Sequence, residues 1–253
     1  MLFRSILDVD ISSNQIIATA SNDQKVNLWN LKGKKIRTLE GNDGHSGSVS
    51  AVNFSPDGNI LATGGYDNTI KLWNQESKFD TPLTLKTCGP VTSLSFSLNN
   101  KTIASACNNQ IQIWNREAKS IIPNQLNSNF DGTVFKISFS PDGKEIAAVE
   151  RGTENVSLCN INSNDCKQLN NKDEDSKDEV EVRNVKFTPD GNKIITAGKD
   201  NTAKIWNTKD AQLLKSLISH NGAIWGLDIS NSKNNQMIAT GSDDKTAKIW
   251  TRN

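Results

Sequence analysis

A short segment recurs along this chain at intervals of slightly more than forty residues. The stretch SPDGNILATGGYDNTIKLWN at 55–74 returns as TPDGNKIITAGKDNTAKIWN at 188–207, and parts of it recur as SPDGKEIAAVE at 140–150 and MIATGSDDKTAKIW at 237–250. Five tryptophans keep the same place in the pattern: Trp29, Trp73, Trp114, Trp206 and Trp250. The gap of 92 residues between Trp114 and Trp206 is about two periods, and Cys159 fills the missing place. The chain therefore contains six repeats, and a period of this size is typical of solenoids and propellers.

Each repeat contains three short strand-like segments and a weaker fourth. In the second repeat they are SVSAVNFS, NILATGG and TIKLWN. These segments are rich in β-branched and aromatic residues and are bounded by turn-forming residues, which indicates strands. A weaker segment, such as KKIRTLE or AQLLKSL, precedes the next repeat. No window shows sustained helical periodicity.

The turns between the first two segments have a chemical explanation. In SPDG at 55–58, proline presets φ at the second position and glycine accepts a positive φ at the fourth. The motif returns at 140–143 and, as TPDG, at 188–191. Segments 12–14 and 98–100 replace it with asparagine, which tolerates the left-handed region.

A four-stranded sheet of this size cannot bury both of its faces alone. Stacking several such sheets around an axis buries the faces and leaves only short edges. The period, strand count and turn chemistry together predict an all-β fold, a β-propeller of six blades built from four-stranded antiparallel sheets. We expect one propeller over 1–253, with blades at approximately 4–40, 48–86, 90–126, 132–170, 181–217 and 222–253.

The segment GHSGSVSAVNFSPDGNILATGGYDNTIKLWN at 44–74 resembles the WD40-repeat propellers, and the resemblance covers essentially the whole chain. In that family a histidine, a serine or threonine, an aspartate and the tryptophan form a hydrogen-bonded tetrad. The resemblance implies complete tetrads in the second and sixth blades: His45, Thr63, Asp67 and Trp73, and His220, Thr240, Asp244 and Trp250. It implies partial tetrads in the first and fifth blades: Thr19, Asp23 and Trp29, and Thr196, Asp200 and Trp206. The third and fourth blades depart from it, with Ala104 and Asn108, and with Val149, Thr153 and Cys159.

A set of histidine, aspartate and threonine also suggests a catalytic triad. That chemistry needs an exposed nucleophile and an oxyanion site. Here the set recurs at one structural position in two blades, and a tryptophan supplies an N–H donor to it, which favours a structural network. The sequence has no phosphate-binding glycine loop, no HExxH and no GxSxG motif. We therefore expect no enzyme activity, no cofactor and no metal site.

The composition limits the classes of partner and the cellular compartment that we expect for this chain. The formal net charge is +1, which gives no electrostatic reason to expect nucleic acid. No apolar run is long enough for a membrane span, and residues 1–10 are too short an apolar stretch for a signal peptide. The four cysteines form neither a CxxC motif nor a disulfide framework, so we expect free thiols in a reducing cytoplasm. Cys159 and Cys166 would approach each other if the last two strands of the fourth blade pair.

A candidate partner face follows from aligning the first strands of the repeats. One position near the start of each of these strands is occupied by Leu7, Ser50, Thr92, Phe135, Arg183 and Trp225. In the family this position lies near the mouth of the central channel and often touches the partner. Phenylalanine, arginine and tryptophan are common at binding hot spots, so Leu7, Phe135, Arg183 and Trp225 are the candidate face. The alternative is that Phe135 and Trp225 fill the gap between blades.

An acidic insert, NNKDEDSKDEVEV at 170–182, lies between the fourth and fifth blades. It is either a solvated loop or a docking segment for a basic partner. The resulting functional hypothesis is a non-catalytic scaffold that binds a protein or peptide on the propeller face. The alternatives are a ligand-sensing or enzymatic propeller that uses the central pocket, and the terminal propeller of a larger signalling protein or a shortened gene product.

The last blade should lack its outer strand. Only residues 251–253 follow its tryptophan-bearing segment, whereas the other blades have a candidate fourth strand. Residues 1–4 reach only about 14 Å, too little to cross to the last blade and pair there. The segment KTAKIWTR at 245–252 would then be an unpaired edge, which is a template for self-association, for a missing seventh blade or for a partner strand.

Overall fold

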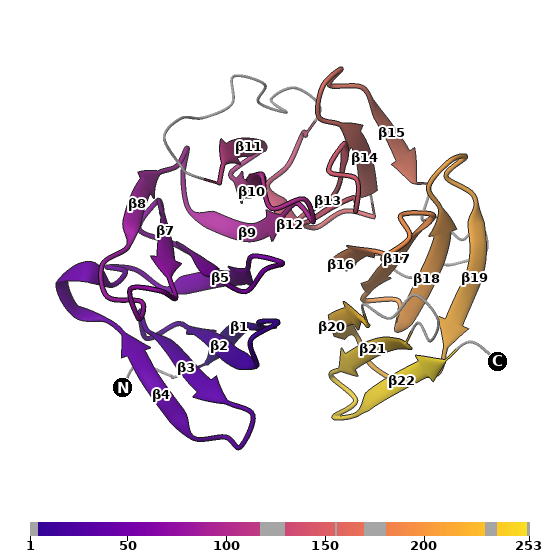
Figure 1. The fold of residues 1–253 in the computed structure, drawn as a ribbon. Helices are drawn as coiled ribbons and strands as arrows, with labels where there is room; N and C mark the ends of the chain where they lie inside the picture. Colours follow the sequence, from indigo (N-terminus) through magenta and orange to yellow (C-terminus); the bar gives the residue numbers. More distant parts are fainter. Residues whose placement is uncertain (1–4, 117–129, 155, 170–180, 231–236, 252–253) are drawn as a thin grey trace. The chain divides into compact units, whose positions relative to one another are not determined.

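The structure is a computed structural model that describes residues 5–116, 130–154, 156–169, 181–230 and 237–251. These residues form antiparallel strands and one short 3-10 helix, Gly41–Asp43. The chain divides into two compact units, residues 1–128 and 129–253, each with three sheets (Figure 1). We number the sheets as blades one to six in chain order.

Unit one contains blades one to three. Blade one consists of β1 (Ile6–Ile11), β2 (Ile16–Ser21), β3 (Val26–Asn30) and β4 (Lys35–Leu39). Blade two consists of β5 (Val49–Phe54), β6 (Ile60–Gly65), β7 (Thr69–Asn74) and β8 (Leu83–Lys86). Blade three consists of β9 (Val91–Phe96), β10 (Thr102–Cys107) and β11 (Gln110–Asn115). Within each sheet, strands consecutive in the chain are neighbours.

Unit two contains blades four to six. Blade four consists of β12 (Val134–Phe139), β13 (Glu145–Glu150), β14 (Val156–Asn160) and β15 (Cys166–Leu169). Blade five consists of β16 (Val182–Phe187), β17 (Lys193–Gly198), β18 (Thr202–Asn207) and β19 (Leu213–Ile218). Blade six consists of β20 (Ile224–Ile229), β21 (Met237–Ser242) and β22 (Ala247–Thr251).

The predicted fold class is confirmed. The chain is all-β, and its six antiparallel sheets are blades of the β-propeller type. The strand-like segments of the second repeat are strands β5, β6 and β7, and the weaker segments KKIRTLE and AQLLKSL contain β4 and β19. The last blade has three strands in the described part of the chain, as predicted. The expected outer strand of blade three and most of the acidic insert lie outside the described residues, and a single domain over 1–253 stays a prediction.

In the turns between the first and second strands, the residues expected to have a positive φ do so, with one exception. Gly58, Gly143 and Gly191 have φ of 75°, 71° and 72°, and the Gly58 amide donates to the Ser55 carbonyl at 2.7 Å. In blade three Asn100 takes this place with φ of 59°. In blade one the left-handed residue is Gln15, with φ of 63°, and not an asparagine, because the fourth position of the turn falls one residue later than Asn14.

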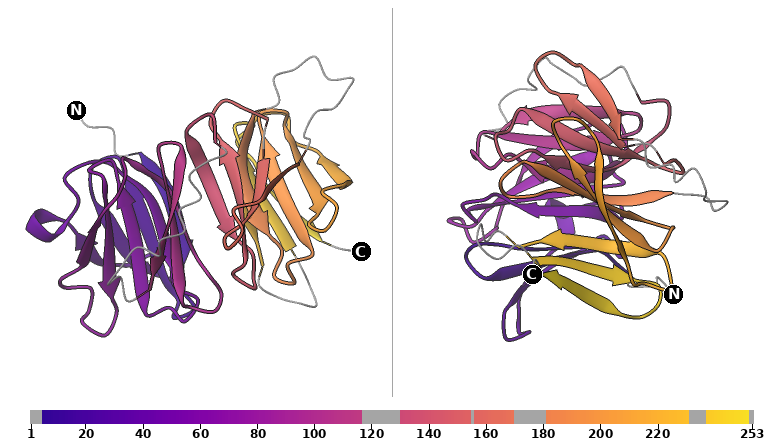
Figure 2. Two further views of the ribbon diagram at one scale, coloured as in Figure 1. Left: turned by 90° about the horizontal axis from the view of Figure 1, so that it is seen from above. Right: turned by 90° about the vertical axis from the view of Figure 1, so that its right-hand side faces the viewer.

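The blades of each unit pack face to face, as the side view in Figure 2 shows. The face that carries the tryptophan, here called the Trp face, packs on the opposite face of the preceding blade. In unit one, Leu61 and Trp73 of blade two lie in one core cluster with Ala18, Val26 and Leu28 of blade one. The same arrangement joins blades two and three, blades four and five, and blades five and six. Burial of these faces is the main stabilising contribution of each unit.

The first strands of neighbouring blades contact each other within each unit: β1, β5 and β9, and β12, β16 and β20. They are not paired into one sheet, so their edge N–H groups need other acceptors. Side chains of the preceding blade supply these acceptors. Asp10 Oδ2 accepts from the Phe54 amide at 2.6 Å, Asn53 Oδ1 from the Phe96 amide at 2.9 Å, and Ser138 Oγ from the Phe187 amide at 3.3 Å.

The fourth strand of a blade buries a leucine at a fixed register. On the third strand, the leucine pairs with the residue that lies three positions before the tryptophan. In blade four it pairs with the residue three positions before Cys159, which replaces the tryptophan. The four pairs are Val26 with Leu39, Ile70 with Leu85, Val156 with Leu169, and Ala203 with Leu217. In blade six the same position is Ala247, which is exposed on the terminal strand β22. Ile249 on that strand is 69% exposed.

We predict that β22 behaves as an open edge. Alternate amides of 247–251 face away from β21 and should exchange with solvent much faster than the amides of β18, which is paired on both sides. Light scattering should show a mass that rises with concentration, and Ile249→Lys should abolish the rise. Ile36→Lys, at an exposed site on β4, is the control. A strict monomer with uniform protection over 247–251 would contradict this prediction.

Candidate interaction site

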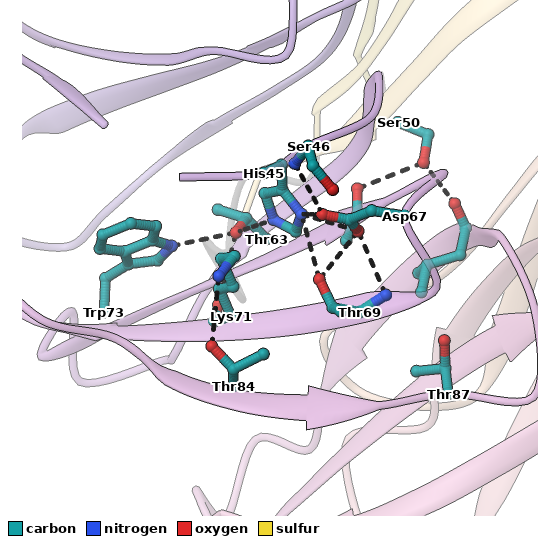
Figure 3. A network of polar contacts seen from close by, with 12 residues as sticks. His45, Ser46, Ser50, Thr63, Asp67, Thr69, Lys71, Trp73, Thr84 and Thr87 are labelled. Atoms are coloured by element: carbon teal, nitrogen blue, oxygen red, sulfur yellow. Dashed lines mark hydrogen bonds and ion pairs between the residues drawn. The ribbon is translucent and has the colours of Figure 1, made fainter. Parts of the chain in front are cut away.

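The blade-two tetrad is fully formed (Figure 3). His45 Nδ1 donates to Asp67 Oδ2 at 2.9 Å, and His45 Nε2 lies 2.8 Å from Thr63 Oγ1. Trp73 Nε1 donates to the same Thr63 Oγ1 at 3.0 Å. This network ties the loop before β5 to the turn after β6 and to the third strand. Each side-chain group of the four therefore has a partner, as a buried polar network requires.

Blade six repeats this network with its own residues. His220 Nδ1 lies 2.8 Å from Asp244 Oδ2, and its Nε2 lies 2.8 Å from Thr240 Oγ1. Trp250 Nε1 donates to Thr240 Oγ1 at 3.1 Å. The sequence NSKNNQ at 231–236, which precedes β21, explains why this histidine lies two residues further from its aspartate than in blade two.

Burial sets the charge state of the blade-two tetrad. Burial lowers the pKa of His45, although the neighbouring Asp67 carboxylate opposes this. Burial by itself would raise the pKa of Asp67, but His45, which is charged once it is protonated in acid, and hydrogen bonds from Thr69 and the Ser46 amide hold it below its usual value. The network is therefore most stable with a neutral imidazole and an ionised carboxylate.

The partial tetrads keep the link between tryptophan and threonine. Trp29 Nε1 donates to Thr19 Oγ1 at 3.0 Å, and Trp206 Nε1 donates to Thr196 Oγ1 at 2.9 Å. In blade five, Asp200 forms an ion pair of 3.0 Å with the buried Lys204. In blade one, Asp23 accepts from the Lys25 amide at 3.2 Å.

The alignment of blades three and four needs correction. Trp114 Nε1 donates to Ser105 Oγ at 2.8 Å. Ser105, and not Ala104, therefore supplies the hydroxyl of the network in blade three. The link spans nine residues there and ten in blade two, because the intervening turn is one residue shorter. In blade four, Cys159 pairs with Ile146, so Ala148 and not Val149 occupies the hydroxyl position.

The expectation of free thiols is wrong. The structure joins Cys88 to Cys107 and Cys159 to Cys166 in disulfides. Cys159 and Cys166 lie directly opposite each other on β14 and β15, with a Cα–Cα distance of 4.0 Å. Cys88 and Cys107 have a Cα–Cα distance of 5.8 Å, which suits a disulfide. The approach of Cys159 and Cys166 follows from the pairing of β14 with β15, as predicted, whereas the Cys88–Cys107 bond depends on a loop contact that no sequence spacing indicates.

The candidate face has a structural signature in every blade. The aligned position is skipped in the pairing of the first two strands, which makes it a β-bulge. The six bulge positions are Leu7, Ser50, Thr92, Phe135, Arg183 and Trp225. A bulge turns its side chain away from the regular alternation of the strand. The first strands therefore each present one redirected side chain at the same end of the blade.

In unit two the bulge side chains form a stack. The Arg183 guanidinium lies 4.6 Å from the Trp225 ring centroid and 5.8 Å from that of Phe135. These distances are in the range of cation–π contacts. Trp225 is 46% exposed, whereas the Arg183 side chain is only 12% exposed. The structure thus brings three predicted residues together, and Arg183 lies between the two rings.

A buried carboxylate fixes the arginine in this stack. Glu181 Oε2 lies 2.7 Å from Arg183 Nη2 and 2.6 Å from Lys199 Nζ, and its Oε1 accepts from the Gly152 amide at 3.0 Å. Burial opposes ionisation of Glu181, but Lys199 and Arg183 outweigh it and hold the pKa of this carboxyl below its usual value. Sequence reasoning placed Glu181 in the acidic insert and missed this role, although its i, i+2 spacing to Arg183 along a strand was visible.

In unit one the bulge side chains are smaller. The Ser50 hydroxyl donates to the Val91 carbonyl, and the Thr92 hydroxyl donates to the Ala106 carbonyl at 3.3 Å. Leu7 is 46% exposed. The chemical character of the bulge positions therefore differs between the units: two hydroxyls and a leucine in one, and an aromatic–arginine stack in the other.

The geometry argues against a catalytic use of the tetrads. The His45 side chain is 1% exposed and Thr63 is fully buried, so no substrate reaches this set. Among the described residues, no three His, Cys, Asp or Glu side chains gather in a way that would hold a metal ion. The described part of the chain also has no helix long and apolar enough to span a membrane.

Six antiparallel sheets, five of which repeat the hydrogen bond from the tryptophan to a hydroxyl of the second strand, define a repeat protein of the propeller class. The sequence model of the family "WD domain, G-beta repeat" matches residues 33–74, 81–115, 173–207 and 211–251. The chain belongs to this WD40-repeat family.

Three relatives illustrate the range of the family. The chain is 24% identical to the Transcriptional corepressor LEUNIG_HOMOLOG of Arabidopsis thaliana, over 93% of this chain and 34% of that protein. It is 28% identical to Eukaryotic translation initiation factor 3 subunit I of Aspergillus niger, over 76% of this chain and 58% of that protein. It is 27% identical to the Nuclear distribution protein nudF of the same organism, over 82% of this chain and 51% of that protein. The chain thus spans about a third to three fifths of the length of these relatives.

We predict that His45→Ala and Asp67→Ala each lower the free energy of unfolding by about 1–3 kcal/mol, because each leaves buried polar partners unpaired. Denaturant unfolding of the variants measures this loss. Equal stability of variant and wild type would show that the network contributes nothing to the fold.

The tetrad also predicts a pH dependence. The pKa values of His45 and Asp67 are both lowered by folding, so the unfolded state binds more protons in acid. Stability should fall as the pH drops below about 6.5, the ordinary histidine value, and again below about 3.9, the ordinary aspartate value. His45→Gln should lose less stability than wild type between pH 7 and pH 5. Parallel curves for the two proteins would contradict the assignment.

Proposed function

We propose that this chain is a non-catalytic interaction module that binds a protein or peptide partner at the bulge positions. The observation that carries the proposal is the stack of Phe135, Arg183 and Trp225 at the bulges of three consecutive blades. Tryptophan and arginine are enriched among the residues that dominate binding energy, and such residues cluster.

The stack is organised before any partner arrives. Arg183 is held by Glu181 and by both rings, so little side-chain freedom is lost when a ligand contacts it. Asn184 Nδ2 donates to the Trp225 carbonyl at 3.1 Å, which fixes the backbone at the exposed ring. Trp225 is the most exposed member of the stack, and we assign it the role of central contact.

The relatives support the proposal at the level of class. Their names describe a transcriptional corepressor, a subunit of a translation initiation factor and a nuclear distribution protein. A corepressor and a factor subunit act together with other macromolecules, which is the kind of role we propose for this chain. The identity of the partner and a cytoplasmic location stay predictions, because these names span several cellular processes and the two disulfides do not favour a reducing compartment.

The experiment is a comparison of Trp225→Ala with Ile218→Ala. Both remove an exposed apolar side chain from unit two, but Ile218 lies on the outer strand β19 and is 76% exposed. Partners captured by the wild-type chain would be purified and their dissociation constants measured for each variant. We expect Trp225→Ala to weaken binding by at least about 2 kcal/mol, roughly thirtyfold, and Ile218→Ala to leave it unchanged.

Thermal melting is the control for folding. Trp225→Ala should melt within a few degrees of wild type, because this residue is already 46% exposed. Arg183→Ala is not a suitable test, since it removes a partner of the buried Glu181 and would change stability as well. Equal affinity of wild type and Trp225→Ala for every purified partner would place the binding site away from the bulge positions.

A further inference from the structure

Blade three holds its loop with a disulfide where blades two and six use histidine and aspartate. In blades two and six, the loop before the first strand is tied to the turn after the second strand by His45–Asp67 and His220–Asp244. In blade three, Cys88 lies in the loop before β9, and Cys107 is the last residue of β10, directly before the turn, at the position of Gly65 in blade two. The sequence separations are comparable, 19 residues for the cysteines against 22 and 24 for the other pairs.

Three glycines give independent support for this equivalence. Each follows the histidine or cysteine within two residues and presses against the turn. A Cβ on Gly47 would meet the Asp67 amide at 2.9 Å, and one on Gly222 would meet the Asp244 amide at 2.8 Å. A Cβ on Gly89 would meet the Asn108 side chain at 2.4 Å. The three loops therefore lie close against the turns, and in blade three the disulfide ties the loop to the end of β10 directly before its turn.

The disulfide carries much of the tie in blade three. Two further hydrogen bonds hold this loop: Asn108 Nδ2 in the turn donates to the Cys88 carbonyl at 3.0 Å, and the Cys88 amide donates to Gln112 Oε1 on β11 at 3.3 Å. Trp114 still binds Ser105, so the sheet itself does not depend on the sulfurs. Loss of the bond would loosen the loop without opening the blade.

The two sulfur atoms differ in access. Cys107 is fully buried in β10, whereas Cys88 is half-exposed in the loop. An external thiol or disulfide therefore reaches the Cys88 end first. Thr92, the bulge position of this blade, follows four residues after Cys88, so the loop leads directly into the candidate partner face.

We propose that Cys88 and Cys107 form a reversible dithiol–disulfide site that exchanges with glutathione, and that its redox state sets how firmly the loop before β9 is held. In the oxidising direction, the Cys88 thiolate attacks glutathione disulfide and releases one glutathione. The Cys107 thiolate then displaces the second glutathione from the mixed disulfide. The sum is one protein dithiol and one glutathione disulfide giving one protein disulfide and two glutathione molecules.

The experiment is a redox titration of the full chain in glutathione buffers, with alkylation and peptide mass spectrometry reporting on Cys88 and Cys107. Amide exchange over 87–91 is measured at both ends of the titration. We expect both cysteines to become protected from alkylation together, and exchange over 87–91 to be about tenfold faster in the reduced protein. The loop at 44–48, held by His45, is the internal control and should not change.

Two variants sharpen the result. Cys88→Ser should show the fast exchange of the reduced protein whether or not a reductant is present. Cys107→Ser should show the same fast exchange and the same lack of response to reductant, because either change removes the bond. If the cysteines stay reactive in glutathione disulfide, or if exchange over 87–91 is the same in both redox states of the wild type, the proposal is overturned.

Discussion

The need to cover both faces of every small sheet governs this molecule. A blade of three or four short strands exposes two apolar faces, and the Trp faces of blades two, three, five and six are each covered by the preceding blade. Because the first strands stand side by side without pairing, aspartate, asparagine and serine side chains must satisfy their edge amides. Face packing and edge capping together fix the spacing of the blades, and that spacing places the bulge positions of neighbouring blades within reach of each other.

In four blades the loop before the first strand is tied to the end of the second strand or to the turn that follows it. Two blades use a buried histidine and aspartate, and blade three uses a disulfide. In blade four a related contact runs from the Gly132 amide to the buried Glu150 carboxylate at 2.9 Å. Different chemistry thus serves one mechanical purpose, which is to hold the segment that leads into the bulge.

Sequence reasoning found the features that repeat and missed those that depend on three-dimensional contact. The repeat period, the turn residues and the tryptophans were sufficient to predict six blades, their strands and both full tetrads. A turn shortened by one residue shifted the alignment of blade three, so Ser105 was overlooked. The approach of Cys159 and Cys166 followed from strand pairing, but the Cys88–Cys107 bond and the role of Glu181 had no local pattern, because they depend on contacts between segments. The bulges were located by alignment alone, but their redirected geometry was not foreseen.

The central claim is that partner binding takes place at the bulge positions. Amide exchange of the chain with and without a bound partner tests it most directly, because it reports on every described strand in one experiment. The account predicts that added protection is concentrated at 134–136, 182–184 and 224–226, around the stack of Phe135, Arg183 and Trp225. Protection confined to the outer strands, such as 213–218, with no change at the bulges would contradict it.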